Sequence, residues 1–418
     1  MDSQNTAQGP NKNALVFILL TGFLSSVGFG IIEPVGPFLV SHYVSDPNSV
    51  GSVLGWLVTS YAICQFVAAP ALGAFSDKYG RRPILLLCMV GSAVGYLLMG
   101  IGGALWVLFL GRIIDGITGG NMSVAFAYVA DSTPPGQRGR YFGLMGAVFG
   151  IGFIVGPALG GLIARLGVAA PFYVTAALTT ANILYGLFFM PESLTQEKRS
   201  EVKLSHLNPL SALADVMAVR ELRWLLIATF LYTLPFAALQ VTIGLFARDS
   251  LNWDVAAIGI IFATVGVTDI FVQGLLLQVL LKRFNESQVA IGGFVSVIVG
   301  YLLIGAVAFL HSSLSLFAGT VVFAMGDGLV GPSLGGLLSR AAGSRSQGKV
   351  QGGSQSVQSL ARIAGPFVGG LMYDSLGHAS PFLAGAGIVL LAIVVVGTAL
   401  PAIKGLAPLA DGSEPAAV

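Results

Sequence analysis

The sequence predicts an all-α membrane protein with twelve transmembrane helices in two pseudo-symmetric six-helix bundles. Its composition is the first observation: mean hydropathy is +0.84 and only 10% of residues are charged, against about 25% in soluble proteins. Second, apolar stretches of about 20 residues or more recur along the chain, and each is long enough to cross a hydrocarbon core of about 30 Å. Third, a motif repeats at half the chain length. A soluble protein cannot bury this many helices that are apolar on every side.

The apolar stretches set the expected spans. They lie near residues 14–40, 51–75, 83–103, 105–130, 139–164, 170–190, 222–247, 255–281, 288–310, 313–339, 350–373 and 379–402. The first stretch is longer than the apolar part of a signal peptide and has no small-residue cleavage site after it, so we expect it to be retained as a helix.

The placement of basic residues tests this topology. Seventeen of the 21 Lys and Arg residues fall in segments on the same side as the two termini, and only Arg165 and Arg248 fall in the opposite loops. Because cytoplasmic loops are rich in Lys and Arg, this asymmetry predicts a multi-pass cell-membrane protein with both termini in the cytoplasm.

A polar segment divides the spans into two groups of six. The expected organisation is a cytoplasmic tail over 1–13, a bundle over 14–190, a cytoplasmic linker over 191–221, a second bundle over 222–403 and a cytoplasmic tail over 404–418. A short surface helix is expected within the linker, near residues 209–219.

The repeated motif relates the two groups. The run GPALGGL starts at Gly156, and GPFVGGL starts at Gly365, 209 residues later. Two halves of the same orientation imply a pseudo-twofold axis along the membrane normal, with the substrate path between the halves. Small residues and prolines at this spacing allow close helix packing, and packing and gating both account for them.

Four segments carry a family resemblance. They are GAFSDKYGRRP from Gly73, GRIIDGITGG from Gly111, GFIVGPALGG from Gly152 and GFGIIEPVGP from Gly28. In their order along the chain and on these helices, the four segments resemble motifs of the major facilitator superfamily, most closely those of the tetracycline and multidrug proton antiporters. The resemblance implies the fold of that superfamily, a monomer, and export rather than import.

The resemblance also implies residues that control conformational change. In the loop after the second helix these are Gly73, Asp77, Gly80 and Arg81, together with Asp131. Asp77 would meet the N-terminus of the eleventh helix, and Arg81 would pair with Asp131, latching the halves in an outward-open state. In the fifth helix the motif that marks exporters supplies Gly152, Gly156, Pro157, Gly160 and Gly161.

One departure from the family concerns the substrate. Tetracycline exporters carry acidic residues in helices one, three and nine, where this chain has Ser25, Gly95 and Ser296. The departure argues against tetracycline itself as the substrate.

Ionisable residues within the spans are the main candidates for function. A charge at the centre of a membrane costs about 2.5–3.5 kcal/mol on insertion scales, so each one calls for a reason. There are six such residues: Glu33, Arg112, Asp115, Asp269, Asp327 and Arg362. Estimated depths predict an ion pair between Glu33 and Arg112, with Asp115 one helical turn from Arg112. The resemblance implies that the helices carrying Asp269, Asp327 and Arg362 pack around the same cavity, where Asp327 and Arg362 could form a pair.

Proton coupling is the role that these clusters favour. Burial favours the protonated form of a carboxylic acid and a nearby guanidinium favours the carboxylate, so a conformational change can move a proton. We expect Asp115 and Glu33 to carry the proton, with Arg112 tuning them. Asp269 or Asp327 could instead contact a cationic substrate, and static pairs that hold helices together remain an alternative.

Four amides within the spans complete the expected substrate cavity, which also includes Asp269, Asp327 and Arg362. They are Asn121, Gln240, Gln273 and Gln355. They would either orient a substrate or bridge helices at about 0.6 kcal/mol each.

Missing motifs narrow the function class. The chain has no phosphate-binding loop of the type that drives transport with ATP, no metal-binding His pattern and no nucleic-acid motif. We therefore expect no enzyme activity, cofactor or metal. The predicted function is proton-coupled export of an amphipathic organic compound, with protons, a small-molecule substrate and the lipid bilayer as partners. The alternatives are a symporter or uniporter for a metabolite or sugar, and a receptor or scaffold that does not transport.

Overall fold

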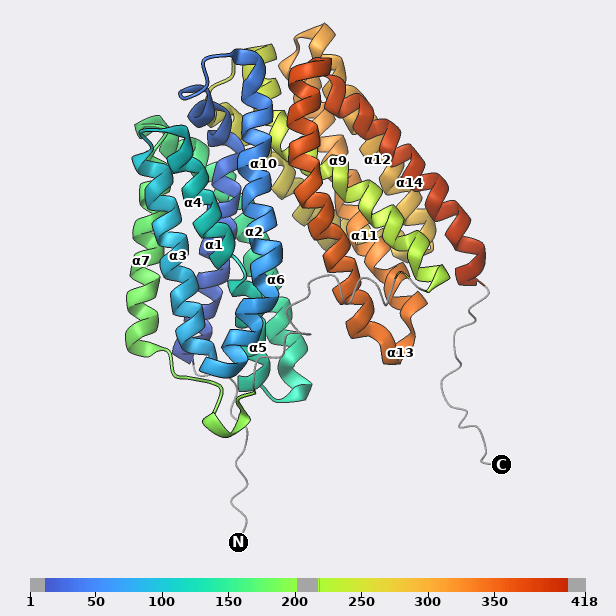
Figure 1. Ribbon diagram of the computed structural model, residues 1–418. Helices are drawn as coiled ribbons and strands as arrows, with labels where there is room; N and C mark the ends of the chain where they lie inside the picture. The colour runs from blue at the N-terminus through green and yellow to red at the C-terminus, as the bar shows by residue number, and fades with distance from the viewer. Residues whose placement is uncertain (1–11, 201–216, 218, 405–418) are drawn as a thin grey trace, which may run out of the picture.

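The computed structural model describes residues 12–200, 217 and 219–404, which form helices joined by short turns and contain no strand. Figure 1 shows two groups of helices side by side: an N-half, α1 to α7, and a C-half, α9 to α14. Helix α1 begins and α14 ends on the same face of the molecule, which we call the terminal face. The opposite face is called the far face.

The N-half contains six crossing segments, one of them broken. Its elements are α1 (Lys12–Ser41), η1 (Pro47–Ser49), α2 (Val50–Tyr79), α3 (Arg81–Ile101), α4 (Leu105–Thr118), α5 (Asn121–Ser132), α6 (Pro135–Ile163), η2 (Ala164–Leu166) and α7 (Ala170–Phe189). The expectation of one continuous helix over 105–130 is wrong, because the chain leaves helical geometry at Gly119 and Gly120. A methyl group at Gly120 would lie 2.9 Å from the Ala69 Cα of α2, so close packing against α2 requires glycine where the helix breaks.

The C-half follows η3 (Gln196–Lys198). Its elements are α9 (Arg220–Leu251), α10 (Val255–Phe271), the π-helical η5 (Val272–Leu276), α11 (Leu277–Leu281), α12 (Glu286–Leu310), α13 (Ser313–Leu376) and α14 (Ser380–Lys404). The surface helix expected near 209–219 lies largely outside the described residues.

Helix α13 joins two expected spans into a single element of 64 residues. A straight helix of that length would measure about 96 Å, roughly three times the thickness of a hydrocarbon core. Both of its ends nevertheless lie at the far face: its start follows α12, whose Gly305 packs on Leu383 near the start of α14, and Asp374, near its end, contacts the start of α2. The element therefore turns back on itself, as Figure 1 shows. We call residues 313–341 its first limb and residues 350–376 its second limb.

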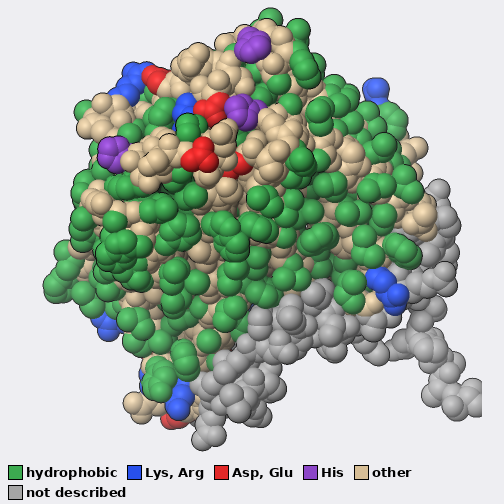
Figure 2. All heavy atoms as spheres, turned by 45° about the horizontal axis from the view of Figure 1, so that its top comes forward, with side chains coloured by type: hydrophobic (Ala, Val, Ile, Leu, Met, Phe, Trp, Pro, Cys, Tyr) green, Lys and Arg blue, Asp and Glu red, His purple; other side chains and the backbone are tan. Residues whose placement is uncertain are grey.

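Helix length and hydropathy support a membrane location. Within the described residues, ten helices are long and apolar enough to span a membrane. The other two expected spans are the broken pair α4–α5 and the second limb of α13. Figure 2 shows a broad belt of hydrophobic side chains, with charged and histidine side chains gathered on the far face. Such a belt matches contact with lipid between two aqueous faces.

The two halves meet along two helix pairs, α2 with α13 and α6 with α10. The repeated motif occupies equivalent places in both. Methyl groups at Gly156 and Gly365 would lie 2.8 Å and 2.6 Å from carbonyl oxygens of Val27 on α1 and Leu234 on α9. Helices α1 and α9 thus occupy equivalent positions, which supports the expected pseudo-twofold relation.

The last glycine of each motif contacts the other half. Gly161 approaches Val255 and Gly259 of α10, and Gly370 approaches Gly51 of α2. The first glycine of each motif therefore brings two helices of the same half into close contact, and the last glycine brings the two halves into close contact. Because small residues let backbones approach closely, a bulkier residue at Gly161 or Gly370 would separate the halves at these points.

Polar contacts between the halves also lie away from the terminal face. Asp374 accepts hydrogen bonds from the backbone N–H groups of Gly51 and Ser52, at 3.1 and 2.6 Å, and from the Ser52 hydroxyl at 2.5 Å. A carboxylate at a helix N-terminus is stabilised by the unpaired N–H groups and by the helix dipole. On the same face, Arg248 of α9 donates to the carbonyl of Pro37 at 2.8 Å. The far face is therefore closed.

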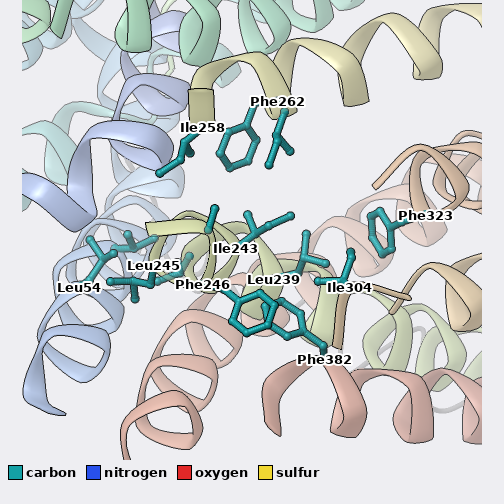
Figure 3. Packing of buried hydrophobic residues seen from close by; sticks show 14 of the residues in the cluster. Leu54, Leu239, Ile243, Leu245, Phe246, Ile258, Phe262, Ile304, Phe323 and Phe382 are labelled. Carbon is teal, nitrogen blue, oxygen red and sulfur yellow. The ribbon is translucent and has the colours of Figure 1, made fainter. Parts of the chain in front are cut away.

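A continuous hydrophobic core supports this closure. It includes side chains from both halves, and Figure 3 shows Leu54 of α2 and Ile258 and Phe262 of α10 around the buried side chains of α9. Helix α9 packs mainly on α13 and α14 of its own half and also contacts α1 and α2 of the N-half.

Replacing Asp374 with Asn should loosen the far face. Hydrogen bonds to a charged group contribute about 1.5–3 kcal/mol, and losing that charge should favour separation of the halves by about tenfold. Spin labels at Leu166 and Leu314, exposed far-face residues in opposite halves, report the change in a variant without Cys64 and Cys88. We expect longer label distances in Asp374→Asn. Asp254→Asn is the matched control, because Asp254 caps α10 within its own half. Equal distances in both variants would rule out the Asp374 contact as a closing interaction.

Replacing Gly95 with Ala should push α3 and α4 apart. A methyl group there would lie 2.7 Å from the Gly111 carbonyl oxygen and 2.8 Å from the Asp115 Cβ. Overpacking of this kind costs about 1–3 kcal/mol, so thermal unfolding in detergent should begin at a lower temperature. In Gly387→Ala the added methyl meets no atom within 4 Å, and this control should unfold at or slightly above the wild-type temperature. A Gly95→Ala protein as stable as that control would show that the two helices are not tightly packed.

Candidate functional site

A cavity of about 1420 Å³ lies between the two halves. At its closed end are residues of the hydrophobic core, including Leu54, Ile243, Phe262 and Phe323. Its other walls extend along α2 and α6 toward the terminal face, to Gly73 and Gly146. The cavity is larger than the roughly 300–1000 Å³ of ordinary ligand pockets and has room for an organic molecule together with water.

Most of the ionisable and amide residues expected in a substrate path line this cavity. They are Glu33, Asp115, Asn121, Gln240, Asp269, Gln273, Asp327, Gln355 and Arg362. Arg112 is the exception among the intramembrane charges, because it lies behind the lining and is only 1% exposed.

Arg112 is held within the N-half. Its Nη1 lies 3.7 Å from an oxygen of Asp115, one helical turn away, and its guanidinium lies 4.3 Å from the centre of the Tyr61 ring. Ser92 donates a further hydrogen bond to Asp115. A guanidinium over an aromatic face is attracted by the ring quadrupole. Asp115 is therefore the point at which a buried ion pair meets the cavity.

Glu33 does not form the expected ion pair with Arg112. The prediction from depth was wrong because Asp115 and Tyr61 already hold the guanidinium. Glu33 is 6% exposed, and neither carboxylate oxygen has a hydrogen-bond partner in the described part of the chain. A buried carboxylate without a partner is costly as an anion, so Glu33 can readily take up a proton or a cationic group.

Two positions where the family resemblance leads us to expect acids lie beside this cluster. Gly95 packs directly against Asp115 of α4, so an acid lies beside this position although the third helix has none there. Ser25 accepts a hydrogen bond from Asn121 at 2.8 Å, which ties α1 to α5. The third position, Ser296, donates to the carbonyl of Val322 at 2.7 Å, outside the cavity lining.

The C-half contributes a second acidic group. Asp327 of α13 accepts a hydrogen bond from Tyr232 of α9. Asp269 of α10 lies near enough to Asp327 to interact with it electrostatically, and its Oδ1 is buried without a partner in the described structure. The expected pair of Asp327 with Arg362 is absent, because Tyr232 occupies the carboxylate and no described carboxylate lies within 4.0 Å of the Arg362 nitrogens.

A third charged cluster lies at the terminal face, outside the cavity. Arg81 contacts Asp77 at 2.5 Å and Asp131 at 2.9 Å, and the second of these is the pair expected from the resemblance. Gly80 has a φ of 107°, which glycine adopts without strain and which lets α2 end and α3 begin at one residue. Asp77 is 43% exposed and pairs with Arg81 on its own half, and it forms no ion pair with the described side chains of the second limb of α13.

Sequence reasoning missed the roles of several residues that organise these clusters. Glu192 accepts from the backbone N–H groups of Arg81 and Arg82 at 2.9 and 3.1 Å and so caps α3. Tyr61 and Tyr232 each engage a charged group. Their sequence signal is only an aromatic residue inside an apolar span, which is equally typical of helix packing.

The described residues provide no group of three or more His, Cys, Asp or Glu placed to hold a metal ion. The chemistry that the cavity supports is proton exchange at carboxyl groups and binding of an organic molecule by aromatic and charged side chains.

Comparisons with known proteins give the chain a family. The family model of the Major Facilitator Superfamily matches residues 18–366 and 225–416. The chain is 37% identical over 403 residues to the class C tetracycline resistance protein of Escherichia coli, covering 94% of this chain and 97% of that protein. It is 28% identical over 389 residues to the quinolone resistance protein NorA of Staphylococcus aureus (strain MSSA476), covering 92% and 96%.

Two solved transporter structures are similar in fold to this chain. The human organic anion transporter MFSD10 (TETRAN) superposes with a TM-score of 0.67 at 26% identity, covering 93% of this chain and all of that chain. A mutant of the nucleoside transporter NupG superposes with a TM-score of 0.69 at 15% identity, covering 94% of this chain and 100% of that chain, a likeness of fold alone. With two related halves around a central cavity and these matches over nearly its whole length, the chain belongs to the Major Facilitator Superfamily of membrane transporters.

Proposed function

We propose that this protein is a proton-coupled exporter of an amphipathic organic compound, working as a monomer in the cell membrane with both termini in the cytoplasm. Relatives of this chain that match it over most of its length are named for resistance to tetracycline and quinolones, which favours export of drug-like molecules. The observation that carries the mechanism is that Asp115 lines the cavity while its partner Arg112 is sealed behind it.

This arrangement couples a proton to the conformation of the transporter. When water fills the cavity around Asp115, the carboxylate is solvated and paired with Arg112. When the cavity closes, loss of water favours the protonated form and opposes the attraction of Arg112, which lies 3.7 Å away. Asp115 therefore exchanges protons with whichever side the cavity faces.

Glu33 is the second proton carrier in this proposal. Its carboxylate lacks any partner in the described structure and lines the closed end of the cavity near the contact between α1 and α9. Burial without a counter-charge favours the protonated form. Two acids in different surroundings give the transporter groups that exchange protons at different stages.

Alternating access requires the halves to rock about the cavity. In the conformation described, the far face is closed by Asp374, Arg248 and the glycine contacts. With cytoplasmic termini, this conformation faces the cytoplasm, where an exporter loads its substrate. The Asp77 side chain is then available to contact the second limb of α13 when the terminal face closes. We therefore assign a gating role to the cluster of Gly73, Asp77, Gly80, Arg81 and Asp131.

Asp115→Asn tests the proposal directly. In proteoliposomes, adding a transported drug should move protons through the wild type but not through Asp115→Asn, because an amide cannot carry a proton. The measurement is the fluorescence of a pH-sensitive dye inside the vesicles. Asp46→Asn, which removes an exposed loop carboxylate, is the matched control and should behave like the wild type.

Two outcomes would contradict the proposal. Normal drug-driven proton movement in folded Asp115→Asn would remove this residue from coupling. Drug movement with no proton movement in the wild type would point to a uniporter of the same fold.

A further inference from the structure

We infer that Arg362 binds the ionised acid group of the transported compound, so that the substrates are aromatic carboxylic acids, including zwitterions. The inference rests on the proposed function, because it takes the central cavity as the substrate path. Among the described residues that line this cavity, Arg362 is the single Lys or Arg.

Arg362 has a free positive charge in an unusual place. It lies near the middle of the second limb of α13, where the neighbouring Ile363 carbonyl accepts a hydrogen bond from Thr59 of α2. Its side chain is nevertheless exposed, and the space it faces is the cavity. A guanidinium at this depth is costly unless it serves a pathway or binds a partner.

No described carboxylate neutralises this charge. Asp115 pairs with Arg112 one turn away on α4, and Asp327 is held by Tyr232. The oxygens of Glu33 are buried and contact no donor in the described structure. The titratable group that interacts electrostatically with Arg362 is the phenol of Tyr61, which is uncharged at neutral pH.

Arg112 shows what a structural arginine looks like in the same protein. It is 1% exposed, stacks on Tyr61 and pairs with a carboxylate. Arg362 lacks both the burial and the carboxylate. A planar guanidinium with a free edge is suited to bind a carboxylate through two parallel hydrogen bonds.

The wall beside Arg362 supplies a surface for aromatic rings. Tyr61 lies next to Phe29, with ring centres 5.9 Å apart, and Phe29 stacks on Phe153 at 5.5 Å with an interplanar angle of 27°. All three side chains line the cavity. A flat aromatic acid can therefore place its carboxylate on Arg362 and its ring along this wall.

The test is equilibrium binding to the purified full-length protein, without any proton gradient. The probes are 1-naphthoate, salicylate and nalidixate, each beside its methyl ester, with ethidium as a cationic probe. We expect the wild type to bind the acids about tenfold more tightly than the esters, because the ester cannot form a charge-assisted pair. In Arg362→Gln this preference should disappear while ester binding stays unchanged.

Two further variants sharpen the result. Arg362→Lys should keep part of the preference for acids, because it retains the charge but not the planar fork. Arg165→Gln removes an exposed arginine outside the cavity lining and should bind every probe like the wild type. If Arg362→Gln does not fold, comparing acid and ester binding in the wild type and in Arg362→Lys still tests the inference.

Three results would overturn the inference: equal binding of acids and esters by the wild type, binding of ethidium but of none of the acids, and unchanged acid binding in folded Arg362→Gln. An equal loss of acid, ester and ethidium binding in that variant would assign Arg362 a structural role and reject it as a specificity residue. Because binding needs no coupling, a protein that binds acids selectively but moves no protons would overturn the proposed function and leave this inference standing.

Discussion

Charged side chains enclosed by membrane-spanning helices are the constraint on which the rest of this structure depends. The hydrocarbon core contains no water and no hydrogen-bonding groups. Each such charge must therefore pair with another group of the protein, contact water in a cavity, or be neutralised by a proton. The protein uses different solutions for different residues. Arg112 and Asp115 form a buried ion pair at the wall of the cavity, Asp327 is held by Tyr232, and Glu33 has no partner in the described structure.

The helix packing makes these solutions possible. Glycines let α3 approach α4 at Gly95, and they let α6 and the second limb of α13 pack closely on their own half and on the other half. Close backbone packing at the far face leaves the opposite part of the interface free to open as a cavity. The charged residues of that cavity are thus placed by contacts between backbones as much as by their own interactions.

The sequence predicted the broad architecture well because hydropathy and the repeated motif report directly on membrane crossing and on symmetry. It also identified most of the charged and amide residues that line the cavity, since an ionisable or amide residue in an apolar span is a strong signal. Partners were harder to predict. Depth along the helices placed Glu33 beside Arg112, and the helix packing implied by the family resemblance placed Asp327 beside Arg362. Neither contains information on rotation about the helix axis or on competing aromatic groups such as Tyr61 and Tyr232. The break at Gly119 and Gly120 was missed for a related reason, because the close approach of α2 is a tertiary contact.

The central claim is that substrate binding in the cavity is coupled to proton exchange at Asp115 and Glu33. The most direct measurement is the pH change when a transported drug is added to the purified wild-type protein in weakly buffered detergent solution, followed with a pH indicator. The account predicts a pH change that saturates with the drug and is reduced when Asp115 cannot hold a proton. Saturable drug binding with no change in pH would contradict it.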